Sequence, residues 1–170
     1  ITVISNIREG TYSDLREDIS KDMVFNAFYA VLFSLIAIGL YITFRFKHWQ
    51  WATGATLALA HNVFLVIGIF SLLYGLMPFA LEVNQSFIAA ILTIIGYSIN
   101  DTVVIFDRIR EYQVLYPKRE IGENINKAIN STLSRTLNTS GTTFVTLLAI
   151  FLFGGETIRG FVFALIFGII

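Results

Sequence analysis

Long apolar stretches separated by short polar segments are the dominant pattern along this chain. The stretch from Met23 to Phe44 holds no Asp, Glu, Lys or Arg, and the stretch from His48 to Leu81 also lacks all four. A helix needs about 20 mostly apolar residues to cross a bilayer, and its backbone groups must be hydrogen-bonded internally. The pattern therefore predicts membrane-spanning helices at about 23–45, 51–74, 84–107 and 132–153, followed by an incomplete fifth span at 158–170.

The polar segments between these spans predict the orientation in the membrane. Arg45 and Lys47 follow the first span, and segment 108–131 carries five Lys or Arg residues, whereas segment 75–83 carries none. Short loops rich in Lys and Arg stay on the cytoplasmic side. We therefore predict a cytoplasmic loop at 108–131. Segment 1–22 is predicted to be extracytoplasmic, as the end of an outside domain and a helix leading into the first span.

Asp101 is the most unusual position in this pattern, because it lies deep inside the third predicted span. A carboxylate in the hydrocarbon layer costs at least ~2.5–3.5 kcal/mol on insertion scales, so such groups face a protein interior or a watery cavity. Arg135 lies about one turn inside the cytoplasmic boundary of the fourth span, at a depth similar to that of Asp101. The two side chains are therefore predicted to approach each other.

Three interpretations of Asp101 and Arg135 remain open. A static ion pair would only hold two helices in register, or Arg135 would extend to the lipid headgroups instead. In the third interpretation, Asp101 gains and loses a proton as Arg135 approaches and withdraws. A nearby guanidinium favours the charged carboxylate, whereas apolar burial favours the neutral form. We favour proton coupling, because ionisable groups inside a membrane generally mark a pathway.

Further polar residues at membrane depth form a predicted supporting pathway. In the fourth span they recur at steps of three and four residues, which places them on one helix face. Threonines in such a stripe are more often packing contacts between helices than part of a pathway, so their assigned role is secondary. The supporting residues are Asn100, Asn138, Thr139, Thr142, Thr143, Thr146 and His61.

Composition excludes several classes of function. The chain is 55% hydrophobic and 14% charged, whereas soluble domains carry about 25% charged residues. It has no Cys for disulfides or thiolate chemistry, and its two His are too far apart for a metal motif. Twelve basic and twelve acidic residues balance, so nothing favours nucleic acid as a partner. With no nucleotide-binding or hydrolase motif, the sequence predicts an all-α integral membrane protein that is not an enzyme and uses no cofactor besides a proton gradient.

Three motifs carry a resemblance to a known family. The run Gly96–Glu111 reads GYSINDTVVIFDRIRE, Arg135–Thr143 reads RTLNTSGTT, and Leu152–Gly155 reads LFGG. Together, and at this spacing, they resemble the SecF branch of the SecD/SecF family of bacterial protein-export subunits. The SecD branch differs around the aspartate. The resemblance covers 23–170.

The resemblance implies a helical bundle like half of a resistance-nodulation-division transporter. We expect a segment truncated at both ends, because the chain starts at Ile1 rather than Met and stops inside an apolar run. The implied function is that of a subunit of the Sec translocase, driven by the proton-motive force, in the bacterial inner membrane. Its implied partners are SecD (separate or fused), the SecYEG channel, SecA indirectly, the preprotein substrate and membrane lipid.

The resemblance also implies roles for individual residues. The functional aspartate and arginine of the family correspond to Asp101 and Arg135. In the second span the family often has His-Asp, but this chain has His61-Asn62, so a second intramembrane carboxylate is missing. Two other functions stay open. One is a proton-coupled exporter of small molecules or lipids with the same fold, and the other is a non-transporting membrane assembly factor with a locked Asp101–Arg135 pair.

Overall fold

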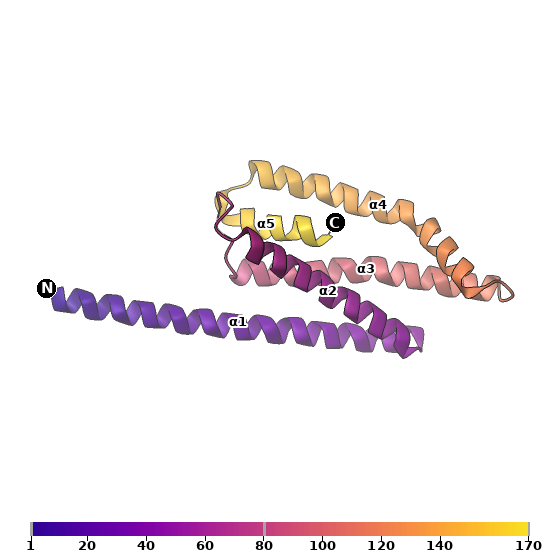
Figure 1. The fold of residues 1–170 in the computed structure, drawn as a ribbon, viewed down its shortest axis with the longest axis horizontal. Coiled ribbons are helices and arrows are strands. Elements are labelled where there is room, and N and C mark those ends of the chain that lie inside the picture. Colours follow the sequence, from indigo (N-terminus) through magenta and orange to yellow (C-terminus); the bar gives the residue numbers. More distant parts are fainter. Residues whose placement is uncertain (1, 80, 170) are drawn as a thin grey trace.

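The computed structural model describes residues 2–79 and 81–169, and over these residues the chain is helical without any β-strand. Its helices are α1 (Thr2–Phe46), α2 (Trp49–Leu73), α3 (Gln85–Leu115), α4 (Ile121–Phe153) and α5 (Glu156–Ile169) (Figure 1). Among the described residues, α2, α3, α4 and the part of α1 from Lys21 onward are long and apolar enough to cross a membrane. The predicted all-α membrane fold is thereby confirmed. Ile1, Ala80 and Ile170, which fall within the predicted segments 1–22, 75–83 and 158–170, lie outside the described residues.

The segment expected as a cytoplasmic loop, 108–131, is mostly helical. Helix α3 continues to Leu115 and α4 already begins at Ile121. Charged residues mark where a helix leaves the apolar layer, but they do not end it, and the pairs Arg108–Glu111 and Glu123–Lys127 support the extended helices at spacings of three and four residues. Pro117 breaks the helix, because proline disfavours helical backbone at the residue before it. Residues 121–131 are thus the first part of α4 and not part of a loop.

Helix α3 is the centre of the bundle, and it packs against each of the other four helices. Figure 1 shows α4 running beside α3, with the shorter α5 between them near the end of α3 where Gln85 lies. The N-terminal part of α1 extends beyond the bundle (Figure 1). Helices α2 and α4 make no contact with each other within the described part of the chain. Helix α2 and helix α4 are therefore separated near the C-terminal end of α5, at Ile169.

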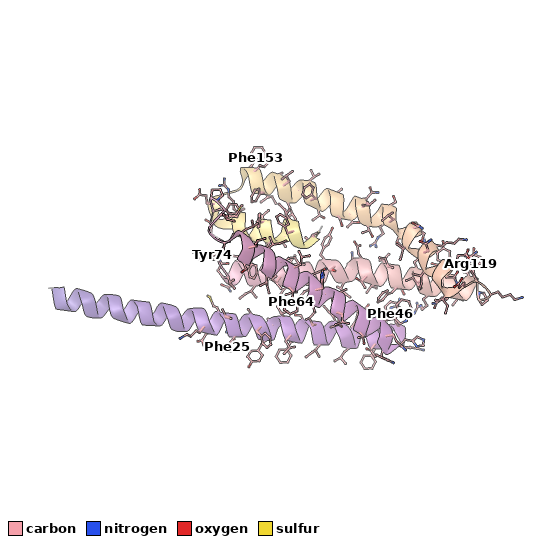
Figure 2. The ribbon with its side chains drawn as sticks, in the orientation of Figure 1. Phe25, Phe46, Phe64, Tyr74, Arg119 and Phe153 are labelled. Atoms are coloured by element: carbon pink, nitrogen blue, oxygen red, sulfur yellow. The ribbon has the colours of Figure 1, made fainter. Side chains whose placement is uncertain are left out.

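Apolar side chains are divided between an interior and an unusually apolar surface. The larger buried cluster joins α2, α3, α5 and, through Leu147, α4, and it includes Leu59, Ile94 and Val162. Large aromatic side chains also point outward, as Figure 2 shows for Phe25 and Phe153, which are 61% and 89% exposed. Such a surface would be an aggregation hazard in water. In a bilayer it contacts acyl chains.

Gly168 is required where α5 crosses α3. A Cβ added there would lie closer than 3.0 Å to three side-chain carbons of Ile94, which is 1% exposed. We expect Gly168→Ala to lower the free energy of unfolding by about 1–3 kcal/mol, because the fully packed Ile94 must move. Thermal unfolding of the protein in detergent measures this change. Gly68→Ala is the control, since a Cβ at Gly68 meets nothing within 4 Å, and an unchanged stability of the Gly168 variant would contradict the prediction.

Candidate functional site

A polar pocket of about 340 Å³ lies where α5 ends and α2 and α4 separate. Helix α3 forms its floor, and every helix except α1 contributes to its wall. The lining residues are Asn62, Leu65, Tyr97, Ser98, Asp101, Thr102, Ile105, Thr136, Ser140, Phe167, Gly168 and Ile169. Asp101 is the one carboxylate among these lining residues. The pocket is large enough for several water molecules, and its hydroxyl and amide groups can hold them.

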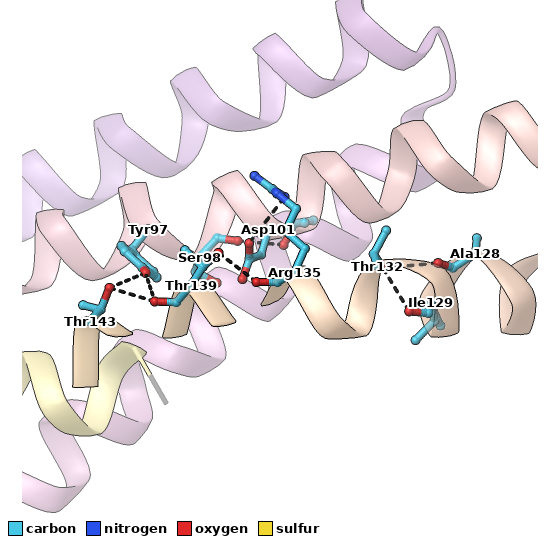
Figure 3. Close-up of polar contacts among 10 residues, drawn as sticks. Tyr97, Ser98, Asp101, Ala128, Ile129, Thr132, Arg135, Thr139 and Thr143 are labelled. Atoms are coloured by element: carbon cyan, nitrogen blue, oxygen red, sulfur yellow. Dashed lines mark hydrogen bonds and ion pairs between the residues drawn. The ribbon is translucent and has the colours of Figure 1, made fainter. Parts of the chain in front are cut away.

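Asp101 and Arg135 face each other across the seam between α3 and α4 (Figure 3). Arg135 Nη1 lies 3.8 Å from Asp101 Oδ1, so the two form an ion pair that is longer than a hydrogen bond. The Asp101 side chain is 16% exposed, whereas that of Arg135 is 46% exposed. Asp101 Oδ1 is buried and has no hydrogen-bond partner among the described residues. A buried carboxylate oxygen left without a hydrogen bond is costly, so this atom is available to accept one from water in the adjoining pocket.

A second polar contact joins α3 and α4 one turn away from this pair. The Tyr97 hydroxyl lies 3.0 Å from the Thr139 carbonyl oxygen and 2.7 Å from Thr143 Oγ1 (Figure 3). On the other side of the pocket, Asn62 Nδ2 donates to Ser98 Oγ at 3.1 Å and joins α2 to α3. These contacts connect the three helices around Asp101 through uncharged polar groups.

The predicted threonine stripe is divided between two faces of α4. Thr139 and Thr143 are half-buried toward α3, but three members of the stripe are exposed, namely Asn138, Thr142 and Thr146. Consecutive residues are rotated by about 100° on a helix. The face that packs on α3 is turned by roughly a quarter of a revolution from the centre of the predicted stripe. It contains Thr136 and Ser140, which were not among the predicted residues. The repeat Thr132, Thr136, Ser140 at four-residue spacing was the available signal.

Of the predicted site residues, only Asp101 is among the lining residues of the pocket. His61 is exposed on α2, and the neighbouring Asn62 lines the pocket instead. Asn100 is also exposed and lies near Ala37 and Tyr41 of α1. The structure therefore brings Asp101 together with Arg135. Thr139 and Thr143 instead contact Tyr97 on the same α3–α4 seam, and His61 and Asn100 are exposed elsewhere. Among the described residues, no group of three or more His, Cys, Asp or Glu side chains could hold a metal ion.

The site offers one chemical event, which is a change of charge at Asp101. With a proton on the carboxylate, the attraction to Arg135 is lost, and the half-exposed guanidinium can move toward water or lipid headgroups. Arg135 is the one charged partner described for Asp101, so the attraction between charges across this part of the α3–α4 seam depends on these two side chains.

Comparison with known proteins gives consistent matches. Residues 2–170 match the family model described as "Protein export membrane protein SecD/SecF, C-terminal". The chain is 51% identical over 151 residues to a protein translocase subunit SecF of Rhodothermus marinus, covering 89% of this chain and 49% of that protein. It is 40% identical over 169 residues to a SecF of Cereibacter sphaeroides, covering 99% and 50%. The chain thus spans about half the length of these curated relatives.

A solved structure is also similar. The crystal structure of SecDF in the super-membrane-facing form superposes with a TM-score of 0.72 at 46% sequence identity. The match covers 79% of this chain and 17% of that one.

Proposed function

The chain belongs to the SecD/SecF family of protein export membrane proteins, and we propose that it is the membrane part of a SecF-type subunit that uses the proton-motive force to assist preprotein export. The observation that carries this proposal is the Asp101–Arg135 pair. In this pair Asp101 is mostly buried, its Oδ1 lies 3.8 Å from Arg135 Nη1, and Asp101 lines a polar pocket. Close Arg–carboxylate pairs are shorter, about 2.7–2.9 Å, and frequently bidentate, so the contact between Asp101 and Arg135 is a loose one.

The attraction within the Asp101–Arg135 pair is similar in size to the free energy that one proton supplies on crossing the membrane. Two unit charges about 4 Å apart attract by ~1 kcal/mol in water and ~4 kcal/mol at an effective dielectric constant of about 20. Because Arg135 is half-exposed, the attraction lies toward the lower end of this range. One proton moving across 100 mV supplies ~2.3 kcal/mol. A single proton is therefore sufficient to break the pair, and neither a nucleotide nor a metal is needed.

The proposed cycle couples this event to helix movement. A proton from outside reaches the pocket and neutralises Asp101, and α4 then moves relative to α3. Release of the proton to the cytoplasm restores the pair. The movement would be passed to an extracytoplasmic domain that holds the emerging preprotein. The proposed partners are SecD, the SecYEG channel, the preprotein and, indirectly, SecA, in the bacterial inner membrane. Gradient-dependent export by vesicles with and without the Asp101 carboxylate tests the proposal.

A partner such as SecD requires a surface on this chain, and α3 provides a candidate. One face of this central helix is exposed although its side chains are small or polar, namely Ala89, Thr93, Gly96 and Asn100. A Cβ at Gly96 would meet nothing within 4 Å, so packing inside this chain does not explain the glycine. Exposed small residues in a spanning helix are typical of close contact with another helix. We propose that a SecD helix packs along this face.

Bulk on this face should weaken the association with SecD. We expect Gly96→Leu to reduce it by about 1–3 kcal/mol, because the added side chain separates two closely packed backbones. Co-purification of SecD with the full-length protein from membranes measures the change. Ala149→Leu is the matched control, since Ala149 is exposed among the apolar residues Val145, Leu148 and Leu152 of α4. Equal recovery of SecD with both variants would refute this assignment of the surface.

A further inference from the structure

Tyr97 makes the shortest polar contact described between α3 and α4. Its hydroxyl is 2.7 Å from Thr143 Oγ1 and 3.0 Å from the Thr139 carbonyl oxygen, whereas the charged groups of Asp101 and Arg135 are 3.8 Å apart. The ion pair is thus the looser of the two connections. We propose that Tyr97 is a positioning residue for the proton site, a latch that holds α4 in the register in which Arg135 reaches Asp101.

Hydrogen bonds within α4 connect this latch directly to the Arg135 turn. Thr143 Oγ1 donates to the Thr139 carbonyl oxygen at 2.9 Å, and Thr139 Oγ1 donates to the Arg135 carbonyl oxygen at 2.8 Å. Tyr97 precedes Asp101 by four residues, so it lies about 6 Å along the same helix face. Tyr97 also lines the pocket that contains Asp101. A displacement of α4 therefore changes the latch and the ion pair together.

The latch adds a cost to the movement of α4. When α4 moves, the Tyr97 hydroxyl loses its contacts with Thr143 and Thr139, and this loss costs about the net free energy of one hydrogen bond. Neutralising Asp101 removes the attraction of the ion pair but leaves the Tyr97 contacts in place. The Tyr97 contacts must then still be broken before α4 can move, which adds a free-energy barrier to the movement. This inference rests on the proposed function for its significance, but the latch itself can be tested separately.

The test uses the absence of cysteine from this chain. In the full-length protein with its partner subunit, in membrane vesicles, Ser140→Cys places the only thiol of this segment in the pocket wall. Its rate of reaction with a small thiol reagent at fixed pH reports how often α4 separates from α3. We expect Tyr97→Phe, which keeps the ring and removes the hydroxyl, to raise this rate about fivefold, the ratio that corresponds to one net hydrogen bond.

Two threonines provide a second variant and a matched control. Thr143→Val removes the latch from the α4 side and should raise the rate as Tyr97→Phe does. Thr142→Val makes the same change one position away, where the hydroxyl bonds to Asn138 O and Thr139 O of its own helix. This control should leave the rate unchanged. The proposed latch is overturned if the thiol reacts at the parent rate in all three variants. It is also overturned if Thr142→Val raises the rate as much as the other two variants do.

A functional readout separates positioning from general destabilisation. We expect Tyr97→Phe to increase proton flux in the absence of preprotein, while gradient-driven export falls. The reason is that α4 then moves without the barrier that the Tyr97 hydrogen bonds provide. A variant that is merely misfolded loses both activities, and this result would overturn the proposed role. The outcomes also distinguish the two proposals. An unchanged thiol reaction in Tyr97→Phe overturns the latch alone, whereas export that does not depend on Asp101 overturns the proposed function alone.

Discussion

Replacing Asp101 by Asn is expected to abolish the stimulation of preprotein export by a proton gradient. Asparagine has nearly the same size and can still accept a hydrogen bond, but it cannot bind and release a proton at neutral pH. One proton crossing 100 mV supplies ~2.3 kcal/mol, which corresponds to about 50-fold in a driven equilibrium. The variant should lose this factor. Export of a preprotein into inverted membrane vesicles, compared with and without an imposed gradient, measures it.

Asp107 provides the control for this substitution. It lies less than two turns further along α3, but it pairs with Arg45 at 3.0 Å and with Arg110 at 3.3 Å and does not line the pocket. Asp107→Asn should therefore keep the response to the gradient. Asp101→Glu, which retains a carboxylate, should keep part of it. Normal stimulation in Asp101→Asn would remove the basis of the proton-coupling proposal.

Exchanging the two charges, with Asp101→Arg and Arg135→Asp together, is expected to eliminate gradient-driven export as fully as Asp101→Asn does. The exchange keeps an opposite-charge pair across the α3–α4 seam. It moves the carboxyl group from the pocket floor, where Asp101 is 16% exposed, to the Arg135 position, which is 46% exposed. A carboxylate there is hydrated and charged at neutral pH. It therefore stays charged when a proton enters the pocket, and the ion pair is not broken. Gradient-stimulated export again provides the measurement.

This experiment distinguishes a working pair from a structural one. A static pair tolerates the exchange, because it needs only opposite charges at contact distance. The exposed pair Arg108–Glu111, 2.7 Å apart on α3, is the internal control. Exchanging its charges should leave export unchanged. The quantity of each variant in the membrane must equal that of the parent, and preserved export after the Asp101–Arg135 exchange would favour the assembly-factor function instead.

The amino-acid sequence alone was sufficient for the fold class and for the central residues of the candidate site. Hydropathy is a local property, and about 20 apolar residues in a row have one stable arrangement in a bilayer, so the hydropathy pattern is enough to locate the helices. The same argument identified Asp101, because the cost of a charge in lipid depends on its depth in the bilayer, and that depth can be read from its position within the apolar stretch. Helix ends were less well predicted, since polar residues at 108–115 and 121–131 continue a helix as readily as they form a loop.

The tertiary structure decided which faces of these helices meet. The rotation of α4 depends on how its side chains pack against α3 and α5, and no local periodicity contains that information. The same packing leaves His61 and Asn100 on outer faces. It also brings Tyr97 into contact with Thr139 and Thr143, 42 and 46 positions away in the chain. The sequence alone was enough to predict the apolar helices and the similar positions of Asp101 and Arg135 along two of them, because transfer energies act on each segment separately. Only the folded bundle decided which of them share a pocket, because that depends on contacts between helices distant in sequence.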